Sequence, residues 1–160
     1  LYTMGAPMGA LVSGLLFRRR HKIVLAYFTF LFAAYFATPI SWQLPIWGMW
    51  DTYCAFAALI IAEITGLKKR VSKYEGRALI YLLMFYAFVG LEADILFRIF
   101  LFIPCRTYSL FFNFTAEDLQ IIWAAGAAYT PLQVGLSALF TSVVGVPLIR
   151  TLKRMNLLKI

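Results

Sequence analysis

The sequence contains few charged residues and a single histidine. Only 14% of its 160 residues are Asp, Glu, Lys or Arg, while 62% are hydrophobic, and that apolar share is far above the usual one for a soluble domain. The charges are clustered and separated by long apolar runs, as in a protein that crosses a membrane several times. The composition therefore excludes an ordinary soluble domain.

The apolar runs also lack the polar–apolar alternation of barrel strands. Because lipid cannot satisfy backbone polar groups, helices are then the remaining way to cross it. No internal repeat, linker or low-complexity tract divides the chain. We therefore predict an all-α integral membrane protein in which residues 1–160 form a single transmembrane helical bundle domain.

Motifs for catalysis are missing as well. The patterns HxxxH, HExxH, GxSxG and the P-loop do not occur, and His21 lies in a basic loop, where we expect it to face water and lipid headgroups. Cys54 and Cys105 have no metal-type spacing, and we expect Cys54 to be a small buried side chain. The sequence predicts no enzyme, no cofactor and no metal motif, although metal binding by acids stays open.

Five apolar segments are long enough to be membrane spans, since about 20 helical residues cross a hydrocarbon core of about 30 Å. They cover residues 1–17, 23–40, 47–66, 78–101 and 119–148. Pro131 should kink or break the last of them. Thr115, followed by Glu117 and Asp118, resembles the N-cap at its start.

The basic residues predict the orientation of these spans. Thirteen of the 15 Lys and Arg residues lie in the loop at 18–22, in the segment 68–77 and in the C-terminal tail. These three regions share one side of the membrane, which the positive-inside rule makes cytoplasmic. The net charge of +8 therefore reflects loops rather than a nucleic-acid partner. We predict a multi-pass protein of the cell membrane with a cytoplasmic C-terminus.

The first residues already belong to an apolar run and have no charged signal-peptide region before them. Five spans with a cytoplasmic C-terminus place Leu1 outside. We therefore expect preceding residues with a sixth span.

Polar side chains from three spans share one depth. Counted from the basic boundary, Asp51, Glu92, Asp94 and Gln133 all lie about 22–25 Å up a helix. Tryptophans and tyrosines lie at or near this level. The layer is either an interfacial belt or an outward-facing pocket in which aromatic rings stack on a solute and polar groups bond it. The candidate solute-binding residues are Trp47, Trp50, Asp51, Glu92, Asp94, Tyr129 and Gln133.

Local spacing assigns some partners within the layer and near it. Asp94 and Arg98 are four residues apart and can neutralise each other on one helix face. Glu92 is two residues from Asp94, so its side chain points to another face of the helix. Glu63 is expected to reach back to the basic segment. Gly5 and Gly9 have the GxxxG spacing that allows two helices to pack closely. The alanine pairs Ala58/Ala62 and Ala124/Ala128 have the same spacing of small residues.

Three segments resemble one family. "GAPMGALVSGLLF" is similar to the Gly-Pro-rich second helix of the substrate-binding S components of energy-coupling factor (ECF) transporters. "YAFVGLEADILF" resembles their fifth helix, and "AYTPLQVGLSALFTSVVGVPLIRTLKR" resembles their last helix. The family's first helix, with its small-residue coupling face, is not visible in this sequence.

The resemblance implies a six-helix bundle that binds a vitamin-like small molecule or metal ion near the outer face. It also implies a transmembrane coupling subunit and ATPase subunits as partners. The bundle would capture solute outside and tip in the membrane, and ATP hydrolysis by the partners would reset it. The alternative function is a non-transporting accessory or scaffold subunit of a membrane protein complex, and membrane enzymes or channels form a further class.

Overall fold

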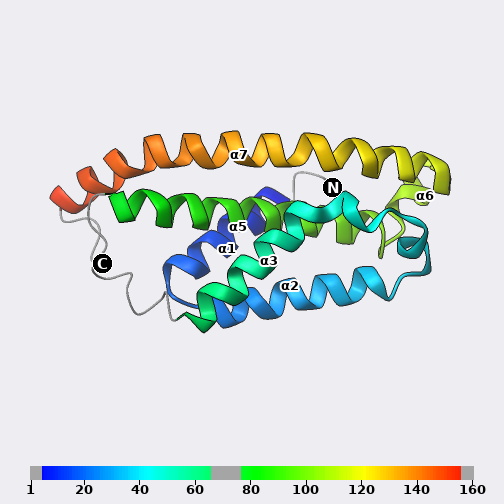
Figure 1. Cartoon of the computed structure of the whole chain (residues 1–160), viewed down its shortest axis with the longest axis horizontal. Helices are drawn as coiled ribbons and strands as arrows, with labels where there is room; N and C mark the ends of the chain where they lie inside the picture. The colour runs from blue at the N-terminus through cyan, green and yellow to red at the C-terminus, as the bar shows by residue number, and fades with distance from the viewer. Residues whose placement is uncertain (1–4, 66–76, 156–160) are drawn as a thin grey trace.

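The computed structural model describes residues 5–65 and 77–155, and these residues form an elongated helical bundle without strands (Figure 1). The α-helices and the two 3-10 helices follow one another in chain order. They are α1 (Gly5–Phe17), α2 (His21–Phe36), η2 (Pro39–Gln43), η3 (Ile46–Met49), α3 (Trp50–Ile64), α5 (Arg77–Phe102), α6 (Thr107–Phe112) and α7 (Ala116–Arg154).

Two of these helices are long and apolar enough to cross a membrane. The candidate spans are Leu79–Phe102 in α5 and Ala116–Thr151 in α7. The helices α1 and α2 are apolar but shorter, and the 13 residues of α1 reach only about 20 Å. Each of the five predicted segments contains one α-helix, and the structure gives two of those helices the length and apolarity of a span.

The predicted boundaries differ from the observed ones next to proline. The helix predicted at 23–40 ends at Phe36, because Pro39 restricts the preceding residue and then starts the 3-10 helix η2. Trp50 begins α3, after η3 has turned the chain. The short helix α6 fills part of the predicted loop between α5 and α7.

The last helix is not interrupted at Pro131. α7 is continuous for 39 residues with Pro131 and Pro147 inside it, so it is about 58 Å long and exceeds the predicted span 119–148. The predicted N-cap is confirmed: Thr115 Oγ accepts from the Asp118 backbone N–H at 3.2 Å, while the Asp118 carboxylate accepts from the Thr115 N–H and hydroxyl.

The described helix ends that adjoin the basic segments lie toward one end of the bundle. Figure 1 shows the α1–α2 turn, the end of α3, the start of α5 and the end of α7 at the left. The η2–η3 segment and α6 lie at the right. The Lys and Arg residues of 68–73, together with the predicted partner of Glu63, lie outside the described residues.

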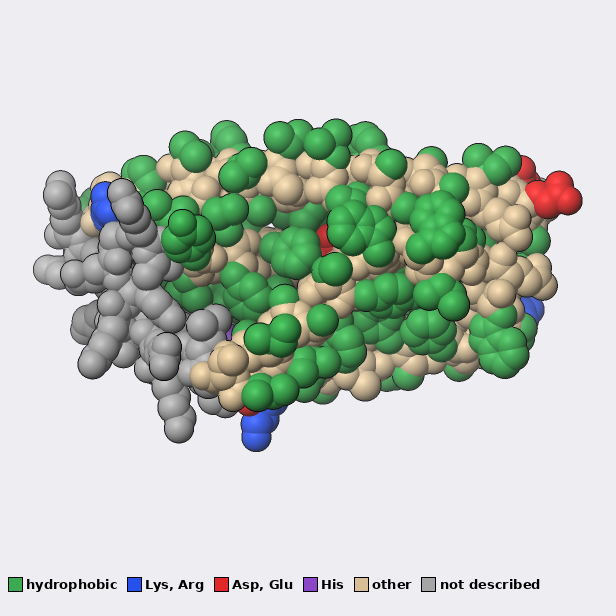
Figure 2. All heavy atoms as spheres, viewed as in Figure 1, with side chains coloured by type: hydrophobic (Ala, Val, Ile, Leu, Met, Phe, Trp, Pro, Cys, Tyr) green, Lys and Arg blue, Asp and Glu red, His purple; other side chains and the backbone are tan. Residues whose placement is uncertain are grey.

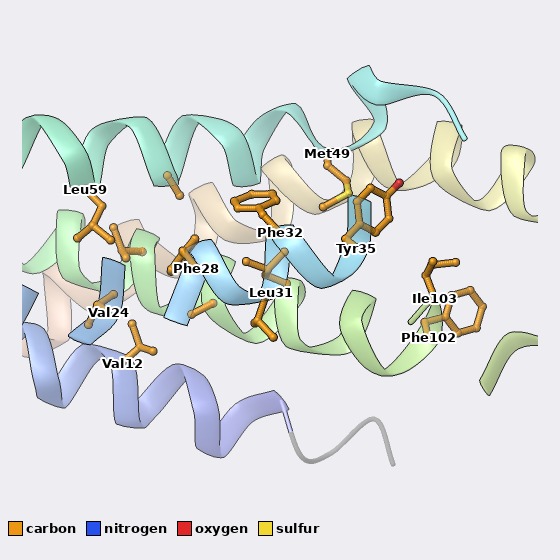
Figure 3. Packing of buried hydrophobic residues seen from close by; sticks show 14 of the residues in the cluster. Val12, Val24, Phe28, Leu31, Phe32, Tyr35, Met49, Leu59, Phe102 and Ile103 are labelled. Carbon is orange, nitrogen blue, oxygen red and sulfur yellow. The ribbon is translucent and has the colours of Figure 1, made fainter. Parts of the chain in front are cut away.

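Aromatic and aliphatic side chains fill the interior along the bundle (Figure 3). Phe28 and Phe32 of α2 contact Phe56 of α3 with ring centroids 6.1 and 5.3 Å apart, and Phe32 also stacks on Tyr53 at 5.4 Å. Each buried aromatic side chain removes about 150–250 Å² of its surface from contact with the surroundings. This core orients α2 and α3 against α5.

The helix α1 packs closely against α5. A Cβ added to Gly9 would lie 2.7 Å from the Gly90 backbone oxygen, and one added to Gly5 would overlap the Asp94 carboxylate. The GxxxG pair therefore packs inside this chain, against a third glycine that the spacing rule did not include. The small residues allow the two backbones to touch.

Two predicted environments are wrong. Cys54 is exposed rather than buried, because it lies outside the stripe of α3 that is buried at Thr52, Ala55 and Leu59, and both cysteines are free thiols. His21 is 1% exposed rather than solvated. Its ring packs edge-on to Tyr86 at 6.3 Å, so the first residue of α2 turns inward although its basic neighbours turn outward.

The outer surface between the two ends is apolar. Exposed large hydrophobic residues continue along α7 from Ile121 to Leu148. Figure 2 shows hydrophobic side chains over most of this face, with Lys and Arg at the left, lower and right margins, an acidic group at the right end and further acidic side-chain atoms in a recess near the middle. Such a continuous apolar surface on a protein with two candidate spans suits contact with lipid.

Candidate functional site

A pocket of ≈ 340 Å³ lies between η3, the start of α3, the second half of α5 and the first half of α7. Most of its walls are apolar, and one side carries carboxylate, hydroxyl and guanidinium groups. The lining residues are Gly48, Met49, Asp51, Thr52, Ile95, Arg98, Ile99, Phe102, Ile122, Trp123, Gly126 and Thr130. This combination of apolar walls with a few polar groups is typical of small-molecule sites.

The aromatic wall is held by stacking. Trp123 of α7 stacks on Tyr35 at 6.2 Å and on Phe102 at 6.5 Å, with interplanar angles of 9° and 14°. Gly48 passes so close to this indole that an added Cβ would lie 2.5 Å from Trp123 Cδ1. The glycine in "IWGMW" thereby lets η3 close over the Trp123 side chain.

The start of α3 is fastened to α7 at Pro131. Proline has no N–H, so the carbonyl of Ala127, four residues earlier, loses its partner within the helix. The Trp50 indole N–H donates to this carbonyl at 3.0 Å. Trp50 thus stabilises a helix that proline would otherwise weaken, and its ring is half exposed beside the pocket.

Asp51, the next residue, also connects α3 to α7. Asp51 is 3% exposed and lies in the first turn of α3, where the helix dipole favours a negative charge. Its carboxylate oxygens contact the Thr52 N–H at 2.9 Å and the Thr130 hydroxyl at 2.5 Å. The dipeptides Trp50-Asp51 and Thr130-Pro131 therefore form one polar link between α3 and α7.

Glu92 of α5 reaches the same group from the other side. Its Oε2 accepts from the Thr52 hydroxyl at 3.0 Å, and that hydroxyl also lies 3.5 Å from Asp51 Oδ1. Glu92 is 0% exposed. Two acids from different helices are thus joined through one threonine.

Asp94 has a separate environment. As predicted, it pairs with Arg98, whose Nε and Nη2 donate to the two carboxylate oxygens at 2.8 and 2.5 Å. Asp94 lines a second hollow, beside Gly9 and Gly90, whereas Arg98 lines the main pocket. The pair therefore fixes the orientation of the Arg98 side chain between the two hollows.

The structure brings some candidate residues together and separates others. Asp51 lines the pocket, and Glu92 and Trp50 lie directly beside it. Trp47, Tyr129 and Gln133 are exposed, with Trp47 at a separate hollow near Gln120. Tyr129 and Gln133 are one turn apart on an exposed side of α7.

Several pocket residues were not predicted from the sequence. Thr52 and Thr130 were passed over because the depth count considered charged, amide and aromatic side chains only. Both could have been found by their positions, since each adjoins a residue that was singled out, Asp51 or Pro131. Trp123 and Phe102 carry no comparable signal, because isolated aromatics are common in apolar helices.

The arrangement combines polar groups with apolar surface. Its polar side presents acceptors at Asp51 and a donor at Arg98, and its apolar walls provide surface for a ring or chain. The part of the chain that the structure describes contains no group of three metal-ligating His, Cys, Asp or Glu residues. Comparison with models of known families, with curated proteins and with solved structures finds no match.

Proposed function

We propose that this protein is a membrane-embedded solute-binding subunit for ATP-driven uptake of a vitamin-like small molecule or metal ion. The observation that carries the proposal is the ≈ 340 Å³ pocket, whose mostly apolar walls also carry Asp51, Thr52, Arg98 and Thr130. Its volume lies in the range of about 300–1,000 Å³ that small-molecule sites have, which favours an organic solute over a bare ion. Donors on the solute would face Asp51, and an acidic group would face Arg98.

The proposal places the chain in the cell membrane as a multi-pass protein with a cytoplasmic C-terminus. The apolar surface of α7 and the two candidate spans support membrane contact. The location of the α1–α2 turn and the end of α7 at one end of the bundle agrees with a shared basic side. The pocket then opens near the outer face, because α3 begins and α5 ends toward the other end.

Labelling of Cys105 tests this orientation. Cys105 is exposed just after α5 ends at Phe102, whereas Cys54 is exposed within α3. In intact cells, we expect a membrane-impermeant maleimide to label Cys105 of the Cys54→Ser variant, because this residue lies on the proposed outer side. The Cys105→Ser variant is the control. Labelling of Cys105 only after the membrane is permeabilised would reverse the orientation.

The partners in this proposal are a transmembrane coupling subunit and ATPase subunits. Their support is the resemblance of three segments to S components of ECF transporters. The solute would bind from outside, the bundle would tip within the membrane, and ATP hydrolysis by the partners would restore it. No chemistry on the solute is needed from this chain.

A second candidate function is that of an accessory or scaffold subunit. It is favoured by Ala124 and Ala128, which are exposed on α7 with the spacing that allows another helix to pack closely. Such a subunit would bind a helical partner and leave the pocket without a solute.

Native mass spectrometry of the complex extracted in detergent from its own cells distinguishes the two. The transport proposal expects a bound small molecule together with ATPase subunits. The scaffold candidate expects a membrane partner and no small molecule. If neither a small molecule nor an ATPase accompanies the protein, the transport proposal is wrong.

A further inference from the structure

We infer that Glu92, Asp51 and Thr52 bind a small monovalent cation of about the size of Na⁺ behind the solute pocket, with Thr130 orienting the Asp51 carboxylate. This ion would be a structural or coupled ligand in addition to the proposed solute. The inference does not depend on the identity of the solute, and its test uses protein to which no solute has been added.

Glu92 supplies the first argument. Its side chain is completely buried, its Oε2 accepts one hydroxyl bond, and its Oε1 is buried without a hydrogen-bond partner among the described residues. An isolated carboxylate in an apolar interior is costly unless a partner compensates it. Its helix neighbours Val89, Ala93 and Leu96 are fully buried and apolar, so they cannot compensate it.

The basic side chain nearest along α5 is already engaged. Arg98 directs its Nε and Nη2 to Asp94. Within residues 5–65 and 77–155, the ion pair formed on α5 is Asp94–Arg98, and no Lys or Arg pairs with Asp51 or Glu92. Compensation of a Glu92 carboxylate must then come from a bound cation or from a proton, and the test below separates the two.

The oxygen atoms are spaced as ligands of one ion. Thr52 Oγ lies 3.0 Å from Glu92 Oε2 and 3.5 Å from Asp51 Oδ1. Oxygens separated in this way can share a cation at about 2.3–2.6 Å from each, the distance typical of Ca²⁺, an ion of nearly the same radius as Na⁺. Thr130 Oγ, which contacts the other Asp51 oxygen, fixes the orientation of that carboxylate.

The number of ligands favours a monovalent ion over a divalent one. Ca²⁺ usually takes 6–8 oxygens, and Mg²⁺ keeps near-octahedral geometry with several waters. Three side chains packed among buried apolar residues offer less than either requires. Asp51 is already stabilised by the start of α3, so a single positive charge suffices for Glu92.

An ion can reach this cluster through the pocket. Asp51 and Thr52 line the pocket, whereas Glu92 lies behind Thr52. The ion would therefore enter from the proposed outer side. A solute in the pocket would cover it, so solute and ion would stabilise each other's binding.

The test measures the thermal unfolding midpoint of the purified full chain in detergent, in NaCl and in choline chloride at equal ionic strength. For the wild type, we expect the midpoint to rise by several degrees with saturable dependence on Na⁺, because a ligand that binds only the folded state stabilises it. Glu92→Gln and Thr52→Val should lose this dependence. Glu117→Gln should keep it, because Glu117 is exposed in the first turn of α7.

Each outcome bears on the inference. Equal midpoints in the two salts for the wild type, or an unchanged Na⁺ dependence in Glu92→Gln, would overturn it, as would a dependence on pH alone. If Glu92→Gln does not fold, the binding of radioactive Na⁺ is compared between the wild type and Thr52→Val. Equal binding by these two proteins would then overturn the inference. Filling the solute pocket through Gly126→Leu should leave the Na⁺ dependence intact, so failure of the ion site and failure of the solute site are distinguishable.

Discussion

Replacement of Gly9 by alanine should destabilise the bundle strongly, although alanine is the better helix former. The new Cβ would lie 2.7 Å from the Gly90 backbone oxygen and 3.3 Å from the Asp94 Cβ. Since the nearest atom is backbone, α1 and α5 must move apart. Overpacking of this kind costs about 1–3 kcal/mol or more, and we expect a clearly lower thermal unfolding midpoint in detergent.

Gly14→Ala is the matched control on the same helix. A Cβ there meets no atom within 4 Å, so the substitution should be neutral or stabilising by up to about 1 kcal/mol through helix propensity. Equal midpoints for the Gly9 and Gly14 variants would show that the α1–α5 contact is looser than described.

Trp50→Phe should be the second costly change. It keeps an aromatic ring but removes the N–H that donates to the Ala127 carbonyl at 3.0 Å. Because Pro131 cannot supply a replacement donor, a polar group in an apolar setting is left unsatisfied, at a cost of about 1–3 kcal/mol. The measurement is again the unfolding midpoint, here with solute binding recorded alongside.

A double-mutant cycle isolates the proline. In Pro131→Ala, residue 131 regains its N–H and can bond the Ala127 carbonyl, so Trp50→Phe should cost less in that background. Trp42→Phe is the control, because the Trp42 indole donates to the Phe36 carbonyl at 2.8 Å at an exposed site, where water can replace it. The same cost for Trp50→Phe with and without Pro131 would contradict the account.

The positions of the helices could be predicted from hydropathy because each apolar run contains one helix. The depth count also identified Asp51 and Glu92, which the structure joins through Thr52. The depth of a residue along a helix does not determine the direction in which its side chain points around the helix axis. Gly126 and Thr130 face the pocket, whereas Tyr129 and Gln133, at similar depths on α7, are exposed.

The errors have the same origin. Cys54 and His21 were assigned from residue type and from neighbouring charges, yet each side chain follows the rotation of its own helix. The bond from Trp50 to the Ala127 carbonyl joins residues 77 positions apart, and only the packing of α3 against α7 reveals it. The stretch "WGMWD" is thus an anchor of α3 as well as a pocket wall.

The central claim is that the pocket between α3, α5 and α7 holds a solute, and native mass spectrometry of two matched variants tests it most directly. Gly126 lines the pocket, Gly135 lies on the same helix outside it, and a Cβ at either glycine meets no atom within 4 Å. We predict that wild type and Gly135→Leu carry the same bound small molecule and that Gly126→Leu has lost it. Retention of that molecule by folded Gly126→Leu, or its absence from the wild type, would contradict the account.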